Sequence, residues 1–251
     1  MRDGRDEMPG TWPKAILIDL DDTIISFDLG VDLDRCWLRA VRTHLPEMRE
    51  MAGELAAAFK EKAEWYWSDP ERHRIGRRDM ARARQEIVAA VLMQWHIHDP
   101  SLAKTIAVTY GEERARQVRL LPGALEAIGL FRSKGIRLGL ITNGGAETQW
   151  AKIRRFNLAG LFDAILIEEE AGVGKPEEGI YLLALEKLGV SAEDAWMIGD
   201  NYEWEIAAPG RLGIRGVWFD HYGAGVPDEA PVKPHLVIRS WGEVLDMMRT
   251  D

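Results

Sequence analysis

Two carboxylates separated by one residue are the feature of this sequence with the clearest chemistry. Asp19 and Asp21 follow the apolar run 16–18, and Thr23 comes two residues later. A short apolar run that ends in acidic residues predicts a strand buried on both faces, as in a parallel sheet. Because such sheets bind ligands beyond the carboxyl ends of their strands, we expect Asp19 at a reaction site. Crowded carboxylates repel each other unless a cation accompanies them, so the pair predicts a metal ion.

Three further groups of polar residues follow apolar runs later in the chain. Thr142 and Asn143 precede two glycines, a combination that suits a phosphate cradle and also an ordinary turn. Lys175 can bring positive charge to a phosphoryl oxygen or to carboxylates, although most lysines are merely solvated. Asp200 can complete an oxygen-ligand site for Mg²⁺, or simply belong to a turn, and Glu205 lies five residues beyond it. Their common position at strand ends predicts that the groups converge on one site.

Short apolar runs that alternate with helical periods predict the elements that position these residues. After the first strand, we expect strands near residues 136–141, 162–167, 195–198, 214–219 and 235–238. Strands alternating with helices imply right-handed crossovers, so the expected fold class is α/β with a doubly wound parallel sheet. Residues 28–117 have helical spacing, with about four helices, and predict an all-helical insert that is a candidate lid. The expected division is a core at 1–27 and 118–251 with this insert between its two parts.

The composition describes an ordinary globular protein and limits its partners. The 251 residues are 46% hydrophobic and 29% charged, with a formal net charge of −9. This excess of acidic over basic residues argues against a nucleic acid or an anionic membrane as the main partner. The single cysteine and an amino terminus without an apolar core predict a cytoplasmic protein, and no apolar run approaches the roughly 20 residues that span a bilayer. A monomer and a homodimer both remain open.

The four groups, taken in order, resemble the motifs of the haloacid dehalogenase superfamily of phosphohydrolases. The matching segments are Asp19-Leu20-Asp21-Asp22-Thr23, Thr142, Lys175-Pro176, and Gly199-Asp200 with the acid at Glu205. The resemblance implies a Rossmann-like core, dependence on Mg²⁺ and a phosphoaspartyl intermediate. It also implies that Asp19, Asp200 and the backbone carbonyl of Asp21 bind the metal, and that the helical insert is a cap.

On this resemblance, the expected reaction is hydrolysis of a small organic phosphate monoester. Asp19 attacks phosphorus, and Asp21 first protonates the leaving alkoxide and then activates water. Thr142, Lys175 and the backbone N–H of Asn143 are expected to hold the phosphoryl oxygens. Thr23 is expected to shape the turn after the strand.

The sequence departs from the family pattern in two places. The second acid of the last motif is commonly aspartate in relatives, and the longer Glu205 leaves its contact with Lys175 or water open. A small-residue pair in relatives is replaced by Ala208-Pro209. Proline inside a helix predicts that this helix begins late or bends near Arg211.

The helical insert is expected to determine which substrate is accepted. An aromatic segment at 65–67 precedes a basic stretch that includes Arg74, Arg77 and Arg78. These residues suit an aromatic and cationic rim for an anionic organic group. The alternative is a pair of core tryptophans followed by a solvated helix face.

Three other functions are compatible with parts of the pattern. A metal-independent 2-haloacid dehalogenase also uses an aspartate nucleophile, but it has no alkoxide for Asp21 to protonate. A phosphoacceptor module of the receiver type places aspartate, threonine and lysine on a similar sheet, but without a large insert after a nucleophile on the first strand. A binding protein without turnover would not need all of the catalytic residue types.

Overall fold

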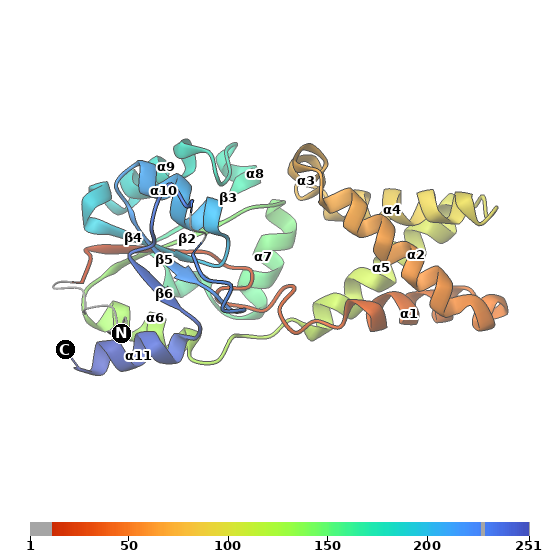
Figure 1. Cartoon of the computed structure of the whole chain (residues 1–251), viewed down its shortest axis with the longest axis horizontal. Helices are drawn as coiled ribbons and strands as arrows, with labels where there is room; N and C mark the ends of the chain where they lie inside the picture. Colours follow the sequence, from red (N-terminus) through yellow and green to blue (C-terminus); the bar gives the residue numbers. More distant parts are fainter. Residues whose placement is uncertain (1–11, 227–228, 251) are drawn as a thin grey trace. The chain divides into compact units, whose positions relative to one another are not determined.

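The chain folds into two compact units, each with its own core (Figure 1). The computed structural model describes residues 12–226 and 229–250. One unit, here called the core unit, contains the chain up to Ser26 and again from Leu120 onward. The other, called the helical unit, is Phe27–Arg119 and contains the predicted insert. Within the described residues, no helix is both long and apolar enough to cross a membrane.

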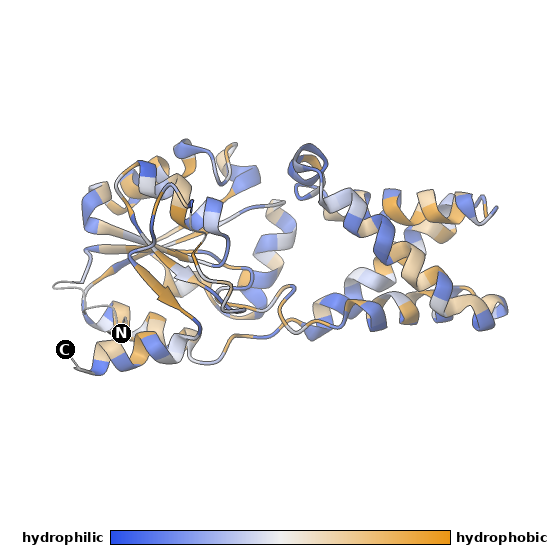
Figure 2. Ribbon diagram, in the orientation of Figure 1, coloured by the Kyte–Doolittle hydropathy of each residue, from blue (hydrophilic) through white to orange (hydrophobic). Residues whose placement is uncertain are grey.

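The core unit is built on a parallel sheet of six strands in the order β3-β2-β1-β4-β5-β6. The strands are β1 Ala15–Ile18, β2 Arg137–Thr142, β3 Ala164–Ile167, β4 Ala195–Gly199, β5 Arg215–Phe219 and β6 Leu236–Ile238. Their mostly apolar residues are buried, as expected for strands covered on both faces (Figure 2). The predicted α/β fold with a doubly wound sheet is therefore confirmed.

Helices cover this sheet and complete its core. They are α6 Ala124–Ser133, α7 Ala146–Arg155, α8 Glu168–Ala171, α9 Glu178–Leu188, the π-helix η4 Tyr202–Ala207, α10 Ala208–Arg211 and α11 Trp241–Thr250. Short 3₁₀ turns lie at Ala159–Leu161 and Ala192–Asp194. Apolar side chains of α9, including Tyr181 and Leu188, pack with residues of β1 and β4 in one cluster. This packing makes the sheet a rigid support for the residues that follow its strands.

The register of the sheet brings three strand ends together. Ile18 of β1 lies beside Leu140 of β2 on one side and Ile198 of β4 on the other. Because all three strands are parallel, the residues that follow them emerge at the same edge. The first, second and fourth predicted groups are therefore neighbours, although they lie far apart in the sequence.

The helix that contains Pro209 differs from the first of the two expectations, a late start, and the bend near Arg211 stays a prediction. It does not begin late, because η4 starts at Tyr202 and continues directly into α10. The backbone N–H of Ala208 donates to the carbonyl of Glu203, five residues earlier, and Pro209 is in the first turn of α10. A proline is tolerated there because its missing N–H is not needed by the new helix.

The helical unit contains five α-helices among the described residues, where about four were expected. These are α1 Leu33–His44, α2 Ala52–Trp67, α3 Pro70–Gly76, α4 Met80–Gln94 and α5 Pro100–Gln117, with a 3₁₀ segment at Pro46–Met51. Four of the helices begin at an aspartate whose side chain accepts a backbone N–H, namely Asp32, Asp69, Asp79 and Asp99. Trp37 of α1 stacks on Tyr110 of α5 at 3.5 Å between ring centroids inside the unit's core.

Candidate active site

Asp19 lies directly after β1, and both of its carboxylate oxygens contact other side chains. Lys175 Nζ donates to Asp19 Oδ1 at 2.5 Å, and Thr23 Oγ1 donates to Asp19 Oδ2 at 3.1 Å. All three residues are buried. Burial raises the pKa of Asp19, and the positive charge of Lys175 opposes this rise. A carboxylate offers about four acceptor positions, so these contacts leave Asp19 able to interact with a further group.

Lys175 lies between two buried carboxylates. Its ammonium donates to Glu205 Oε1 at 2.7 Å as well as to Asp19. Burial by itself lowers the pKa of a lysine, but the charges of Asp19 and Glu205 raise the pKa of Lys175 above its ordinary value. Burial raises the pKa of Glu205 to about 7, and the charge of Lys175 limits that rise. The shared cation is what makes burial of both carboxylates tolerable.

Glu205 reaches Lys175 because the end of β4 leaves room for its longer side chain. Its second oxygen, Oε2, accepts the backbone N–H of Asn201 at 2.7 Å. A Cβ added to Gly199 would lie 2.1 Å from Cγ of Glu205, so this position requires glycine. The contact left open by the sequence is therefore a direct ion pair with Lys175.

Asn143 holds the loop that carries Lys175. The backbone N–H of Lys175 donates to Asn143 Oδ1, and Asn143 Nδ2 donates to the backbone carbonyl of Lys175, both at 2.8 Å. The amide of Asn143 thus joins the end of β2 to the loop before α9. Its side chain positions Lys175, while the predicted phosphate contact through its backbone N–H stays a prediction.

Two residues of α7 that sequence patterns did not single out hold the carboxylate of Asp21. Lys152 Nζ lies 2.8 Å from Oδ1 and 2.7 Å from Oδ2, and Gln149 Nε2 donates to Oδ2 at 3.1 Å. Gln149 Nε2 also contacts Thr142 Oγ1 and lies 2.9 Å from the carbonyl oxygen of Asn143. The available sequence signal was their spacing of three residues, which puts both on one face of the helix that follows Thr142.

Asp200 follows β4 and is strongly affected by neighbouring acids. Burial, with the negative charges of Asp19, Glu205 and Asp22, raises the pKa of Asp200 to about 9. A cation shared by Asp19 and Asp200 would remove this repulsion, and carboxylate oxygens suit Mg²⁺. No cluster of three His, Cys, Asp or Glu side chains suited to a metal occurs in the described part of the chain. Two carboxylates are nevertheless compatible with Mg²⁺, because this ion usually keeps several waters.

The three arginines predicted to contact substrate lie at or just after α3 in the helical unit. Arg74 pairs with Glu71 at 2.7 Å, and both side chains are exposed. Arg77 is the C-cap of α3, and Arg78 is exposed. Trp65 is 51% exposed, which does not match the alternative of a core tryptophan. The substrate contacts of Arg74, Arg77 and Arg78 stay a prediction.

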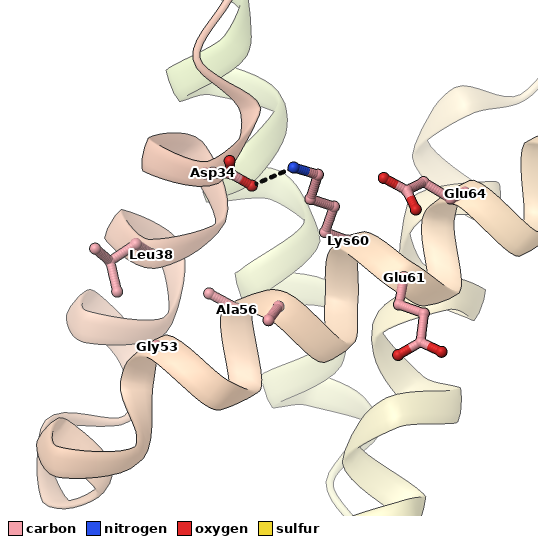
Figure 3. Close-up of a pocket in the computed structure, with 8 residues that line it drawn as sticks. Asp34, Leu38, Gly53, Ala56, Lys60, Glu61 and Glu64 are labelled. Carbon is pink, nitrogen blue, oxygen red and sulfur yellow. Dashed lines mark ion pairs between the residues drawn. The ribbon is translucent and has the colours of Figure 1, made fainter.

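The helical unit also has a hollow of about 610 Å³ between α1 and α2 (Figure 3). Lys60 and Asp34 form a 2.8 Å ion pair in its wall, and Glu61 and Glu64 add two further acids. An acidic lining with an already paired lysine does not suit a phosphate ester. We therefore assign the site to the strand ends of the core unit.

Comparison with known proteins identifies the class of this protein. The sequence profile of the haloacid dehalogenase-like hydrolases matches residues 13–213. The chain belongs to this family and is a hydrolase, as its motifs predict.

Curated relatives of similar length are phosphatases. The chain is 29% identical to the phosphoserine phosphatase of Thermus thermophilus, with 92% of this chain and 97% of that protein covered. It is 30% identical to the glyceraldehyde 3-phosphate phosphatase of Methanopyrus kandleri, with 80% and 81% covered.

Solved structures show the same fold over nearly the whole chain. The HAD-hydrolase YfnB of Bacillus subtilis, solved with bound magnesium, has a TM-score of 0.68 and 21% identity, with 95% of this chain and 99% of that chain covered. A 2-haloacid dehalogenase of Pseudomonas syringae has a TM-score of 0.63 and 24% identity, with the same coverage of 95% and 99%. At these identities the similarity describes the fold alone.

Proposed function

We propose that this protein is a Mg²⁺-dependent phosphatase that hydrolyses a small organic phosphate monoester through an aspartyl phosphate on Asp19. The observation that carries the proposal is the pairing of two carboxylates with separate cations. Asp19 contacts Lys175 in a buried network, whereas Asp21 contacts Lys152 at the edge of that network. We assign nucleophilic attack to the more buried Asp19 and proton transfer to the less buried Asp21. The phosphatases among the curated relatives support the same reaction class.

In the first half of the reaction, an oxygen of Asp19 forms a bond to phosphorus while the ester oxygen departs. Asp21 gives its proton to that oxygen. In the second half, Asp21 takes a proton from water, the water oxygen bonds to phosphorus, and the bond from Asp19 breaks. Thr142, Lys175 and the backbone N–H of Asn143 stabilise the phosphoryl oxygens.

The residues that would hold Mg²⁺ are Asp19, Asp200 and the backbone carbonyl of Asp21. When bound, the ion neutralises the repulsion between the nucleophile and the phosphoryl oxygens. The raised pKa of Asp200 supports this assignment, because burial and the neighbouring acids raise this pKa more than the charge of Lys175 lowers it.

We expect activity to depend on Mg²⁺. Treatment with EDTA should remove at least about nine-tenths of phosphate release, and added Mg²⁺ should restore it. Ca²⁺ should inhibit, because it prefers more ligands and longer bonds than an octahedral Mg²⁺ site provides. The measurement is phosphate release from a panel of sugar phosphates, nucleotides, phosphoserine and phosphoglycolate.

Full activity without metal would instead favour the dehalogenase alternative. A direct assay for dehalogenation is therefore needed, because the fold is shared with a haloacid dehalogenase. Release of halide from 2-haloacids in EDTA, without phosphate release from any ester, would replace the present proposal.

Lys152→Met should show whether Lys152 positions Asp21 for protonation of the leaving group, because its ammonium contacts both oxygens of that carboxylate. We expect kcat/KM to fall about tenfold for phenyl phosphate, whose phenolate leaving group is basic, since a phenol has a pKa of about 10. The loss should be small for p-nitrophenyl phosphate, because nitrophenolate departs without a proton. Steady-state kinetics on each ester give the ratio of kcat/KM between the variant and the native protein.

Arg154→Met is the matched control, since Arg154 is an exposed cation on the same helix. Arg154→Met should leave kcat/KM unchanged for both esters. If Lys152→Met slows both esters equally, Lys152 does not act through Asp21 on the leaving group.

A further inference from the structure

Gln149 of α7 is a buried amide that connects three residues of the candidate active site. Its side-chain nitrogen, Nε2, lies 3.1 Å from Oδ2 of Asp21 and 2.9 Å from the carbonyl oxygen of Asn143. The same nitrogen contacts the hydroxyl oxygen of Thr142. The residue is only 2% exposed, so these oxygens are its partners in place of bulk water.

The partners of Gln149 determine which way its amide points. The carbonyl oxygen of Asn143 can only accept a hydrogen bond, so the nitrogen of the amide, rather than its oxygen, must face it. An amide nitrogen donates two hydrogens and accepts none. Each oxygen that contacts Nε2 is therefore an acceptor, and this includes the hydroxyl oxygen of Thr142.

The contact with Gln149 restricts the hydroxyl hydrogen of Thr142. Because Nε2 accepts no hydrogen bond, this hydrogen must point away from Gln149. Thr142 is the last residue of β2, at the edge of the sheet where the candidate site lies. A hydroxyl that accepts from Gln149 on one side thus keeps its hydrogen for a phosphoryl oxygen on another side. An acceptor at position 149 would instead draw this hydrogen to itself.

Gln149 also makes the two carboxylate oxygens of Asp21 different from each other. Oδ2 accepts from Gln149 Nε2 and from Lys152 Nζ at 2.7 Å, whereas Oδ1 accepts from Lys152 alone among the described residues, at 2.8 Å. A proton on a carboxylate oxygen is repelled by donors that point at the same oxygen. When Asp21 carries the proton for the leaving group, this proton therefore lies on Oδ1.

The helix that carries Gln149 is held in place by acidic side chains of α8. Glu169 Oε2 accepts the backbone N–H of Ala146, the first residue of α7, at 2.6 Å. Glu170 Oε1 accepts the indole N–H of Trp150 at 2.8 Å. These contacts fix the first turn of α7 and the residue next to Gln149, so the amide is presented to the site from a rigid support.

We propose that Gln149 is a positioning residue that directs two hydrogens in the reaction. It turns the hydroxyl hydrogen of Thr142 toward a phosphoryl oxygen and places the acid proton of Asp21 on Oδ1. The proposal rests on the phosphatase function proposed above, which gives Thr142 and Asp21 their roles. Gln149 acts through these two residues, so its removal should have no effect on phosphate binding once the hydroxyl of Thr142 is also absent.

A double-mutant cycle on p-nitrophenyl phosphate tests the action of Gln149 through Thr142. Nitrophenolate departs without a proton, so kcat/KM for this ester does not depend on the acid role of Asp21. Gln149→Met and Thr142→Val should each lower kcat/KM by about tenfold, and the double variant should lose no more than Thr142→Val alone. Losses that multiply to about a hundredfold would overturn the proposal, because the two residues would then act independently.

Gln149→Glu keeps the shape of the side chain and replaces the donor by an acceptor. The introduced carboxylate should draw the hydroxyl hydrogen of Thr142 to itself, so we expect a loss in kcat/KM at least as large as in Gln149→Met. Native kcat/KM in Gln149→Glu would overturn the proposal. Thr148→Met is the matched control, since Thr148 is an exposed neighbour on α7. A loss in Thr148→Met equal to that in Gln149→Met would overturn the proposal as well.

Phenyl phosphate tests the action of Gln149 through Asp21, because its leaving group needs a proton. Gln149→Met should lower kcat/KM for this ester by about threefold or more beyond the loss on p-nitrophenyl phosphate. The additional loss should persist in the Thr142→Val background, since it does not depend on that hydroxyl. Equal losses of kcat/KM on the two esters would overturn the placement of the Asp21 proton.

Binding of inorganic phosphate tests the same proposal without turnover. Calorimetric titration of the full chain with phosphate in the presence of Mg²⁺ should give a Kd about tenfold higher in Gln149→Met and in Thr142→Val than in the native protein. The double variant should bind no more weakly than Thr142→Val, and Thr148→Met should keep the native Kd. Multiplying losses of affinity, or no phosphate binding by the native protein, would overturn the role of Gln149. If the native protein binds phosphate but hydrolyses no ester, the phosphatase proposal fails, and this titration still decides whether Gln149 acts through Thr142.

Discussion

Asp19→Asn is expected to reduce phosphatase turnover by more than a hundredfold while the protein remains folded. An amide oxygen is a far weaker nucleophile than a carboxylate, so the aspartyl phosphate cannot form. Lys175 keeps Glu205 as an ion-pair partner in this variant, which limits the effect on folding. A hundredfold loss corresponds to about 3 kcal/mol of transition-state stabilisation. The measurements are kcat on the best substrate and the thermal unfolding midpoint.

Asp22→Asn is the matched control for this substitution. Asp22 is in the same segment and has φ of 55°, a conformation that asparagine also adopts. The Asp22→Asn variant should retain most of the native kcat. If Asp19→Asn keeps more than about a hundredth of the native kcat, Asp19 is not the nucleophile.

Lys175→Met is expected to destabilise the fold by about 3–5 kcal/mol and to abolish most turnover. The substitution leaves Asp19 and Glu205 buried without their shared cation, and breaking a buried ion pair on one side typically costs this amount. Turnover should fall at least as far as in Asp19→Asn, because the phosphoryl oxygens lose a positive charge as well. Urea unfolding and steady-state kinetics measure the two effects.

The stability of Lys175→Met should recover as the pH falls. Burial raises the pKa of Glu205 to about 7 even beside Lys175, so removal of that lysine raises this pKa further. A carboxyl group whose pKa is higher in the folded protein stabilises it at low pH and loses that contribution as the pH rises through the folded-state pKa. The difference in the free energy of unfolding between Lys175→Met and the native protein should therefore become smaller as the pH is lowered from about 8 to about 5.

Lys187→Met serves as the control, since Lys187 is an exposed lysine in α9. It should show neither the loss of stability nor the pH dependence. A Lys175→Met protein as stable as this control at pH 8 would contradict the account of Lys175 as the shared cation.

The sequence determined the fold class and which strand ends carry the chemistry. The apolar run before Asp19 favoured a buried strand, and the alternation of such runs with helices implied a parallel sheet. In such a sheet, the carboxyl ends of the strands share one edge, so the sequence alone predicted that Asp19, Thr142 and Asp200 lie close together. These are consequences of hydrophobic pattern and strand direction, which are local properties of the chain.

Only the tertiary structure decided which side chains complete the site. Lys152 contacts Asp21 across 131 positions and Lys175 contacts Glu205 across 30, and both contacts depend on how a helix is rotated against the sheet. Arg74 of α3 and Arg84 of α4 likewise look alike in sequence, although Arg74 is exposed and pairs with Glu71, whereas Arg84 is partly buried and its Nε has no hydrogen-bond partner among the described residues. Burial and pairing of a charge depend on the packing of several elements at once. A sequence pattern reports the periodicity of one element, and therefore it does not contain that information.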